Sequence, residues 1–155
     1  MYESTYNGEL ELLAFFATFL LLFLAVFIVV YVFLAIGLMK MAKRENIENP
    51  WLAWIPIAQS YILGKLVSHK QGENSGWIVL GLTILSSFAS IIPIIGWIIP
   101  IGVGIYMFVL FHWIYEKYSN KAALMTIFTV LSAGSLSAIF IFAIRNNESK
   151  IESAA

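Results

Sequence analysis

Apolar residues dominate three long stretches of the chain, and charged residues are confined to the segments around them. Residues 12–39, 74–115 and 122–144 contain no Asp, Glu, Lys or Arg. A helix of about 20 apolar residues crosses the hydrocarbon core of a bilayer, and the middle stretch is about twice that long. The pattern predicts an all-α integral membrane four-helix bundle, with spans at about residues 10–40, 76–92, 97–116 and 121–144.

A turn must divide the middle stretch into two of these spans. The sequence "IIPIIGW" contains Pro93 and Gly96, which interrupt a helix, and Trp97, whose ring favours the membrane interface. We therefore predict a helical hairpin at this point, within a single membrane domain that comprises residues 1–155.

The segment "NPWLAWIPIAQSYILGKLVSHK" is apolar, but a second proline and several polar residues interrupt it. Asn49 is a favourable N-cap and Pro50 a favourable first helical residue, whereas Pro56 removes a backbone donor and should kink the helix. We predict a kinked interfacial or re-entrant helix over about residues 50–68, between the first and second spans. A fifth span and an irregular loop are the alternatives.

Aromatic, basic and polar side chains in this segment suit a membrane surface. Tryptophan and tyrosine rings concentrate at the headgroup level, and lysine ammonium groups can face lipid phosphates. Gln59 and Ser60 could line a substrate path or receive a partner's helix, or they could satisfy the carbonyl that Pro56 leaves without a donor. The candidate interaction or lipid-facing residues are therefore Trp51, Trp54, Pro56, Gln59, Tyr61 and Lys65.

The composition narrows the class of protein further. The chain is 61% hydrophobic and 12% charged, whereas soluble domains are about 45–50% apolar and about 25% charged. Nine Lys and Arg residues balance nine acidic residues, so no bulk positive field attracts nucleic acid, and we expect no nucleic-acid partner. The absence of cysteine excludes disulfides, thiolate metal sites and a cysteine nucleophile.

The distribution of positive charge predicts the orientation, because cytoplasmic loops retain Lys and Arg. In the four-span topology, seven of the nine such residues lie between the first and second spans or in the turn after the third. Only Arg145 and Lys150 fall on the other side. We therefore expect both termini outside the cytoplasm, and an acidic N-terminal segment that leads into a retained first span rather than a cleaved signal.

His112 and Glu116 are four residues apart, so they share one face of the third span near its cytoplasmic end. They form a candidate polar vestibule that could bind a cation or relay protons. The alternative is a polar helix end that reaches to water beside Lys117. The chain has no metal-ligand spacing and no nucleophile motif, so we predict no catalytic, metal or cofactor-binding residues, and nothing in it favours an enzyme.

Small residues recur in the last predicted span. Ala133 and Ser137 are four residues apart, and so are Gly134 and Ala138. Small residues at this spacing let the backbones of two helices approach closely. They predict packing within the bundle or, alternatively, a homodimer face.

The order of these features resembles a family of small multi-spanning bacterial membrane proteins of unknown function. The resemblance covers about residues 36–146 and includes a Trp-x-x-x-Ile-Pro motif after the first span. It implies a location in the bacterial cytoplasmic (inner) membrane and assigns no functional residue. The matching positions are Trp51, Trp54, Ile55, Pro56, Tyr61 and Lys65.

Together these features predict a chain that works mainly by lateral contacts. We expect a non-enzymatic accessory or immunity-type partner of a larger membrane complex, in contact with the lipid bilayer and with a membrane protein partner or further copies of itself. The alternatives are an oligomeric transporter or channel subunit, and a lipid-sensing or lipid-acting protein.

Overall fold

The computed structural model describes residues 2–89, 91–92 and 95–151 of the chain. Within these residues all regular structure is helical and no strand occurs, so the predicted all-α class is confirmed. The elements are α1 (Tyr2–Arg44), η1 (Pro50–Trp54, a 3-10 helix), α2 (Gln59–Leu66), α3 (Ser68–Gln71), α4 (Ser75–Ala89), α5 (Ile95–Tyr118), α6 (Ala122–Leu131) and α7 (Ser135–Ile144).

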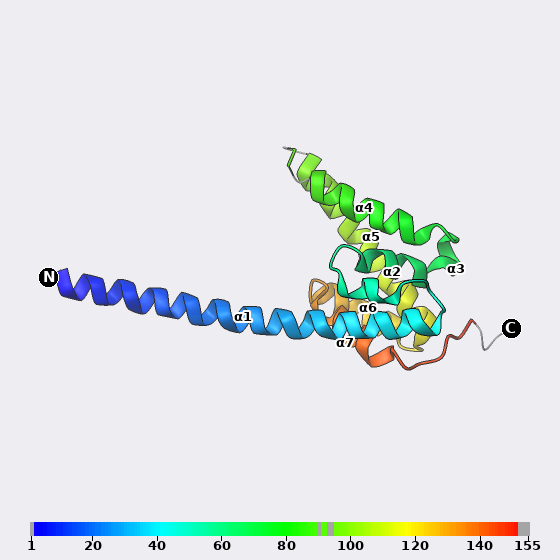
Figure 1. Cartoon of the computed structure of the whole chain (residues 1–155), viewed down its shortest axis with the longest axis horizontal. Helices are drawn as coiled ribbons and strands as arrows, with labels where there is room; N and C mark the ends of the chain where they lie inside the picture. The colour runs from blue at the N-terminus through cyan, green and yellow to red at the C-terminus, as the bar shows by residue number, and fades with distance from the viewer. Residues whose placement is uncertain (1, 90, 93–94, 152–155) are drawn as a thin grey trace.

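Helix α1 has 43 residues and extends beyond the predicted first span at both ends. Its N-terminal part stands apart from the other helices, which gather around its C-terminal end (Figure 1). The large apolar side chains from Leu10 to Val29 are 47 to 66% exposed. α1 ends in a Schellman turn, because Asn46 adopts a left-handed φ of 52° and the Ile47 amide donates to the Ala42 carbonyl at 2.9 Å.

The segment after this turn folds back along α1, and it is not a single kinked helix. It begins at Pro50 as predicted, but the Asn49 side chain caps no backbone amide and instead accepts a hydrogen bond from Trp51 Nε1 at 3.3 Å. Pro56 lies in a break that separates η1 from α2. Because α2 has eight residues, about 12 Å of helix, it cannot cross a hydrocarbon core of about 30 Å. The alternative of a fifth span here is therefore wrong.

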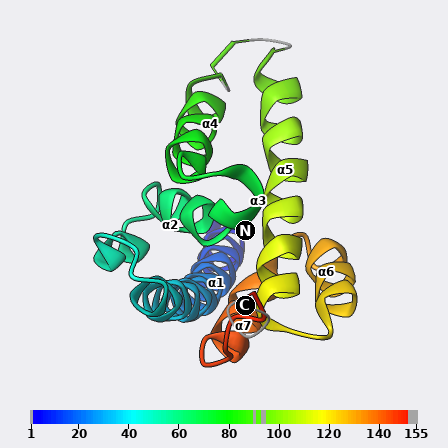
Figure 2. The same cartoon turned by 90° about the vertical axis from the view of Figure 1, so that its right-hand side faces the viewer.

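Helices α4 and α5 form the predicted pair and extend together away from α2 (Figure 2). α5 continues through Pro100 without a break. Trp97 lies within the first turn of α5 and is strongly exposed. The predicted break at Pro93 lies outside the described residues.

Two glycines set the close contact between α2 and α4. A Cβ atom at Gly64 would lie 2.5 Å from the Ser75 carbonyl oxygen and 2.8 Å from the Gly76 Cα, both of which are backbone atoms. A Cβ atom at Gly76 would lie 2.8 Å from Cγ of Lys65. Because real Cβ atoms do not approach backbone this closely, only glycine at position 64 allows the two helices to cross at this distance.

The predicted fourth span, residues 121–144, is wrong: it consists of two short helices joined by a reversal. α6 and α7 have ten residues each, about 15 Å of helix. This is about half the thickness of the hydrocarbon core of a bilayer. The chain then returns to the end of α5, where the Lys150 amide donates to the Lys117 carbonyl at 3.1 Å and Asn147 Nδ2 donates to the Tyr118 carbonyl at 2.8 Å.

The small residues that suggested helix packing form this reversal instead. Ala133 and Gly134 have φ values of 50° and 90°, both in the left-handed region. The Gly134 amide donates to the Thr129 carbonyl at 2.7 Å and the Ala133 amide to the Val130 carbonyl at 3.0 Å, the two bonds of a Schellman motif. The four-residue spacings from Ala133 and Gly134 therefore do not lie on one continuous helix.

The buried core lies where α2, α5 and α7 meet the C-terminal third of α1. α7 approaches α1 closely at Gly37, where a Cβ atom would lie 2.8 Å from Cγ2 of Ile141, and the rings of Phe33 and Phe142 stack at 4.7 Å. The largest fully buried apolar side chains are Leu38, Met41, Ile62, Leu66, Leu110, Ile114, Tyr115 and Ile141.

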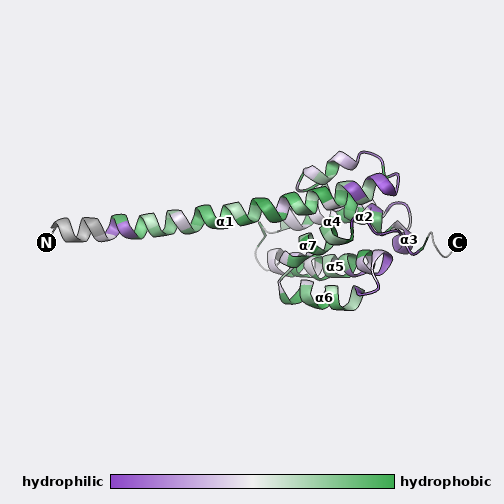
Figure 3. Cartoon of the chain, turned by 90° about the horizontal axis from the view of Figure 1, so that it is seen from below, coloured by the Kyte–Doolittle hydropathy of each residue, from purple (hydrophilic) through white to green (hydrophobic). Residues whose placement is uncertain are grey.

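Two described helices are long and apolar enough to cross a membrane, with candidate spans at Gly8–Arg44 and Gly96–Tyr118. α4, α6 and α7 are apolar but shorter. Polar residues gather at the end of the molecule where α1 and α5 terminate, and apolar residues cover most of the remainder (Figure 3).

Candidate functional site

The ends of α1 and α5 meet at a partly buried ion pair that is part of the polar end of the molecule. Lys117 Nζ lies 2.6 Å from Glu45 Oε2, and Tyr118 OH donates to Glu45 Oε1 at 2.5 Å. The Lys117 side chain is 6% exposed and that of Glu45 22%. Lys117 Nζ also lies 3.5 Å from the Leu66 carbonyl, so the same ammonium group contacts the end of α2.

Sequence reasoning missed this pair, because Glu45 and Lys117 are 72 residues apart and each looks like an ordinary charge beyond an apolar run. One signal was present: Glu45 follows directly on Lys43 and Arg44, so it is the first acidic group after the first span. No local pattern identifies its partner, since that depends on how α1 and α5 pack.

The structure does not bring His112 and Glu116 into a shared vestibule. His112 Nδ1 lies 2.8 Å from Thr126 Oγ1, which links α5 to α6. Glu116 instead pairs with Lys70 of α3 at 3.3 Å, and both of these side chains are exposed. The two predicted vestibule residues thus contact different neighbours.

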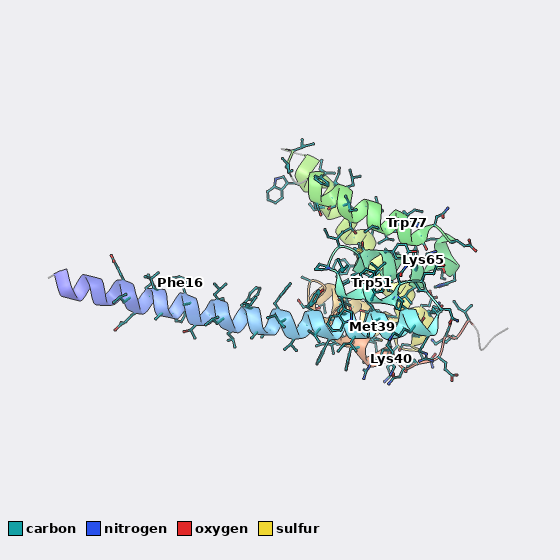
Figure 4. The ribbon with its side chains drawn as sticks, viewed as in Figure 1. Phe16, Met39, Lys40, Trp51, Lys65 and Trp77 are labelled. Carbon is teal, nitrogen blue, oxygen red and sulfur yellow. The ribbon has the colours of Figure 1, made fainter. Side chains whose placement is uncertain are left out.

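Three of the predicted interaction residues lie on the exposed side of the segment around η1. Trp51, Trp54 and Pro56 are all exposed. Trp54 Nε1 points to Met39 Sδ at 3.3 Å, and the Trp54 carbonyl accepts a hydrogen bond from Tyr31 OH. Figure 4 shows Trp51 and Met39 at the packed end of α1, well separated from Phe16 on its uncovered part.

Gln59 bonds to the backbone of the segment that precedes α2. Its side chain is buried, and Nε2 donates to the Ala53 carbonyl at 2.7 Å across the break at Pro56. Ser60 Oγ donates to the Ile57 carbonyl at 2.6 Å within the same turn. These bonds fit the interpretation that the two polar side chains satisfy backbone groups at the interruption, although Gln59 also borders an apolar groove of about 560 Å³.

Tyr61 and Lys65 lie on the side of α2 that faces α4. The Tyr61 ring meets that of Trp77 edge to face at 5.1 Å. Lys65 Nζ donates to the Glu73 carbonyl at 2.8 Å and lies 5.9 Å from the centre of the Tyr61 ring. Figure 4 shows Lys65 and Trp77 on neighbouring helices. Together with Glu45 and Glu48 these residues border a polar cavity of about 480 Å³.

A second cavity, of about 360 Å³, has Lys117 of this ion pair in its lining. It is lined by His69, Lys70, Glu116, Lys117, Lys150 and Ile151. Partial burial, followed by the positive charges of Lys117 and then Lys70, lowers the pKa of His69 below its ordinary value of 6.5. Imidazole at this position is therefore held in its neutral form at neutral pH.

Among the described residues no group of three or more His, Asp and Glu side chains is arranged to hold a metal ion. Comparison of the chain with protein families, with curated proteins and with solved structures gave no match. We therefore infer function from the geometry of the chain itself.

Proposed function

We propose that this chain is an integral membrane protein that acts as a non-enzymatic accessory partner of a larger membrane complex, by packing α1 against a transmembrane helix of that complex. The uncovered part of α1 is the observation that carries this proposal. Its large apolar side chains from Leu10 to Val29 remain about half exposed or more in the folded chain. In water an uncovered apolar surface of this size would aggregate, so lipid and other helices are its natural environment.

The arrangement of charge supports a membrane location. The nine Lys and Arg residues all follow residue 39, and described contacts connect Lys117 to Glu45, Lys150 to Ser119, and Arg44 to the Arg145 carbonyl at the same end of the molecule. A four-span topology would separate two of the nine residues from the rest. A topology in which α6 and α7 enter and return keeps all nine on one side, which is a stronger positive-inside bias.

The proposed topology differs from the four-span expectation in its last segment. α1 and α5 cross the bilayer, α4 accompanies α5, and α6 with α7 forms a re-entrant pair, with irregular backbone at Ala133 and Gly134. The N-terminus then lies outside, and Arg145 lies with Arg44 in the cytoplasm. We propose the cytoplasmic membrane of a bacterium as the location, an expectation that comes from the sequence pattern of residues 36–146 alone.

The role of α1 as a recognition helix can be separated from its role as an anchor. Replacing residues 12–29 by leucine keeps the helix apolar but removes the shapes of its phenylalanine, alanine and valine side chains. We expect this variant to remain in the membrane and to lose the partner that a photo-crosslinker at Phe16 or Phe23 captures and that co-purifies with the wild-type chain. Retention of the same partner by the leucine variant, or crosslinks only to lipid and to the chain itself, would contradict the accessory role.

A second variant tests the membrane location alone. Leu21 is 66% exposed, so an arginine at that position displaces little packing within the chain. At the centre of a membrane span an arginine costs roughly 2.5–3.5 kcal/mol of insertion free energy. We expect Leu21→Arg to reduce the fraction of the chain that carbonate washing leaves in the membrane, whereas Lys40→Arg at the polar end leaves it unchanged. Equal fractions for the two variants would contradict the span.

A further inference from the structure

One face of α1 follows the line of contact with α7 and ends in positive charge. Four residues of this face lie within about 60° of one another around the helix, because 3.6 residues make one turn. They are Phe33, Gly37, Lys40 and Arg44. A Cβ atom at Gly37 would meet Ile141 of α7, so this is the face on which α7 packs. Lys40 and Arg44 therefore lie on the side of α1 where α7 ends.

Arg145 brings a third positive charge to this place from the end of α7. Arg44 Nη1 donates to the Arg145 carbonyl at 3.5 Å. The Arg145 guanidinium lies over the Phe142 ring, 3.5 Å from its centre, and also donates to the Phe142 carbonyl. The last turn of α7 thus holds this guanidinium in position, and Figure 4 shows Lys40 at the same end of α1.

No acidic side chain pairs with these three charges within the described residues 2–89, 91–92 and 95–151. Glu45, which follows Arg44 in the chain, is engaged with Lys117. Lys40 makes no described side-chain hydrogen bond, and Arg44 and Arg145 each use one of their five N–H donors. The three residues therefore carry positive charge that described contacts do not neutralise, together with donors that a ligand can use.

An apolar surface lies next to these charges, on the side toward the membrane. The rings of Phe33 and Phe142 stack across the line of contact between α1 and α7, and neither ring is fully buried. Phe33 precedes Lys40 by seven residues, about 10 Å along a helix. With the charges at the level of lipid phosphates, this separation places the two rings at the level of the acyl chains.

We propose that Lys40, Arg44 and Arg145, at the shared end of α1 and α7, bind an anionic phospholipid. Its phosphate accepts hydrogen bonds from the ammonium and guanidinium groups, since the planar guanidinium matches two phosphate oxygens at once. One acyl chain lies along Phe33 and Phe142. The apolar rings beside the charges favour a lipid over a soluble phosphate ester, which has no chain to place on them. The proposal rests on the membrane location proposed above and not on the accessory role.

The test uses the purified full chain in nanodiscs that contain equal amounts of phosphatidylcholine and phosphatidylglycerol. Native mass spectrometry of protein released from the discs counts the lipids of each kind that remain bound. We expect phosphatidylglycerol to be retained in preference to phosphatidylcholine. Equal retention would overturn the proposal and leave the accessory role untouched, because no partner protein is present. A chain that does not enter nanodiscs would contradict the membrane location itself, and with it the lipid site.

A soluble competitor separates the two sources of phosphate. Glycerol phosphate has the phosphate of the lipid without its acyl chains. In excess it should not displace phosphatidylglycerol, because it gains no contact with Phe33 and Phe142. Displacement would overturn the lipid assignment and identify the ligand as a soluble phosphate ester.

Charge variants separate this site from general attraction to a basic surface. Lys40→Gln and Arg44→Gln should each weaken retention of phosphatidylglycerol by about fivefold, the effect of one basic residue near an anionic membrane surface. Lys40→Arg keeps the charge and should keep the lipid. Lys121→Gln is the matched control, since Lys121 is exposed directly before α6, on another part of the chain.

The control decides between a site and a surface. We expect Lys121→Gln to retain phosphatidylglycerol as the wild-type chain does. If it lost as much of the lipid as Lys40→Gln, the positive surface as a whole would account for binding and the proposal would be overturned. Circular dichroism of each variant shows that its helices are intact, and retention by Lys40→Arg shows that substitution at this position does not itself disturb the fold.

Discussion

The ammonium group of Lys117, one residue before the end of α5, lies 2.6 Å from the carboxylate of Glu45, one residue after the end of α1. The pair joins the last turn of α5 to the long helix that opens the chain, and Tyr118 donates to the second oxygen of the same carboxylate. Removing one partner of such a pair leaves an uncompensated charge in a site that water scarcely reaches.

Glu45→Ala should therefore destabilise the fold by roughly 3 kcal/mol, near the lower end of the range of about 3–5 kcal/mol for buried pairs, because Glu45 keeps some contact with solvent. Unfolding in mixed detergent measures the change. Adding Lys117→Met to Glu45→Ala should restore much of the loss, since no buried charge remains. Glu116→Ala, which breaks the exposed pair with Lys70, serves as the control and should cost less than about 1 kcal/mol. Equal costs for the two single variants would show that burial does not distinguish the pairs.

Gly64→Ala should separate α2 from α4, because the new methyl group would meet backbone atoms at 2.5 to 2.9 Å. We expect a clear fall in thermal stability together with altered fluorescence of Trp77, which packs on Tyr61 beside this crossing. Gly81→Ala is the matched control within α4, since nothing lies within 4 Å of its Cβ position. It should be neutral or stabilise the helix by up to about 1 kcal/mol, the propensity difference between alanine and glycine. A stable Gly64→Ala variant with unchanged fluorescence would contradict the close crossing.

Cysteine labelling can test the reversal at Ala133 and Gly134, because the chain has no cysteine of its own. Asn120 and Asn146 are exposed and lie at the two ends of the α6–α7 pair. We expect Asn120→Cys and Asn146→Cys to react from the same side of the membrane, and Gly8→Cys to react from the other side. If Asn146→Cys reacted together with Gly8→Cys, residues 121–144 would cross the bilayer as one span and the re-entrant pair would be excluded.

His69 should make the fold less stable in mild acid. Its pKa is lowered by partial burial and by Lys117 and Lys70, against a smaller opposing effect of Glu45. Between this lowered pKa and 6.5 the unfolded chain binds more protons than the folded chain, so stability falls as the pH is lowered through that interval. His69→Gln should remove this part of the pH dependence.

The contribution of the neighbouring charge can be measured directly. Lys70→Ala removes one of the causes that disfavour protonation, so an NMR titration should give a pKa for His69 that is closer to 6.5. Lys40→Ala should leave the titration unchanged, because Lys40 is not among the charges that act on His69. An unchanged pKa in Lys70→Ala would show that Lys70 is farther from the imidazole in solution than in the structure.

Much of the helical content could be predicted from the sequence, because a long apolar run satisfies its own backbone hydrogen bonds when it forms a helix. Residues 10–40, 76–92 and 97–116 correspond to α1, α4 and α5, whose ends differ from these bounds by up to eight residues. Local chemistry also predicted the interruption at Pro56, since proline cannot donate to the helix that precedes it. Residues 122–144 contain no charged residue, and the length of this run alone could not show that the chain reverses within it.

Less of the candidate site could be predicted from the sequence. His112 and Glu116 share a face of α5, but Thr126 and Lys70, which lie on other helices, determine what each contacts. Gln59 could be interpreted in two ways until its contact with the Ala53 carbonyl was known. The role of Glu45 could not be predicted, because only the packing of distant helices brings its partner Lys117 close to it.

The sequence by itself determined that the chain is helical and strongly apolar and that its positive charges all follow the first long apolar run, because hydropathy and charge are properties of residues in order. Only the tertiary structure decided where the chain reverses and which charges meet. A Schellman turn at Ala133 sends α7 back beside α1, and that return brings Lys150 to Lys117. Both outcomes depend on backbone hydrogen bonds and on helix packing over many residues, which no local pattern records.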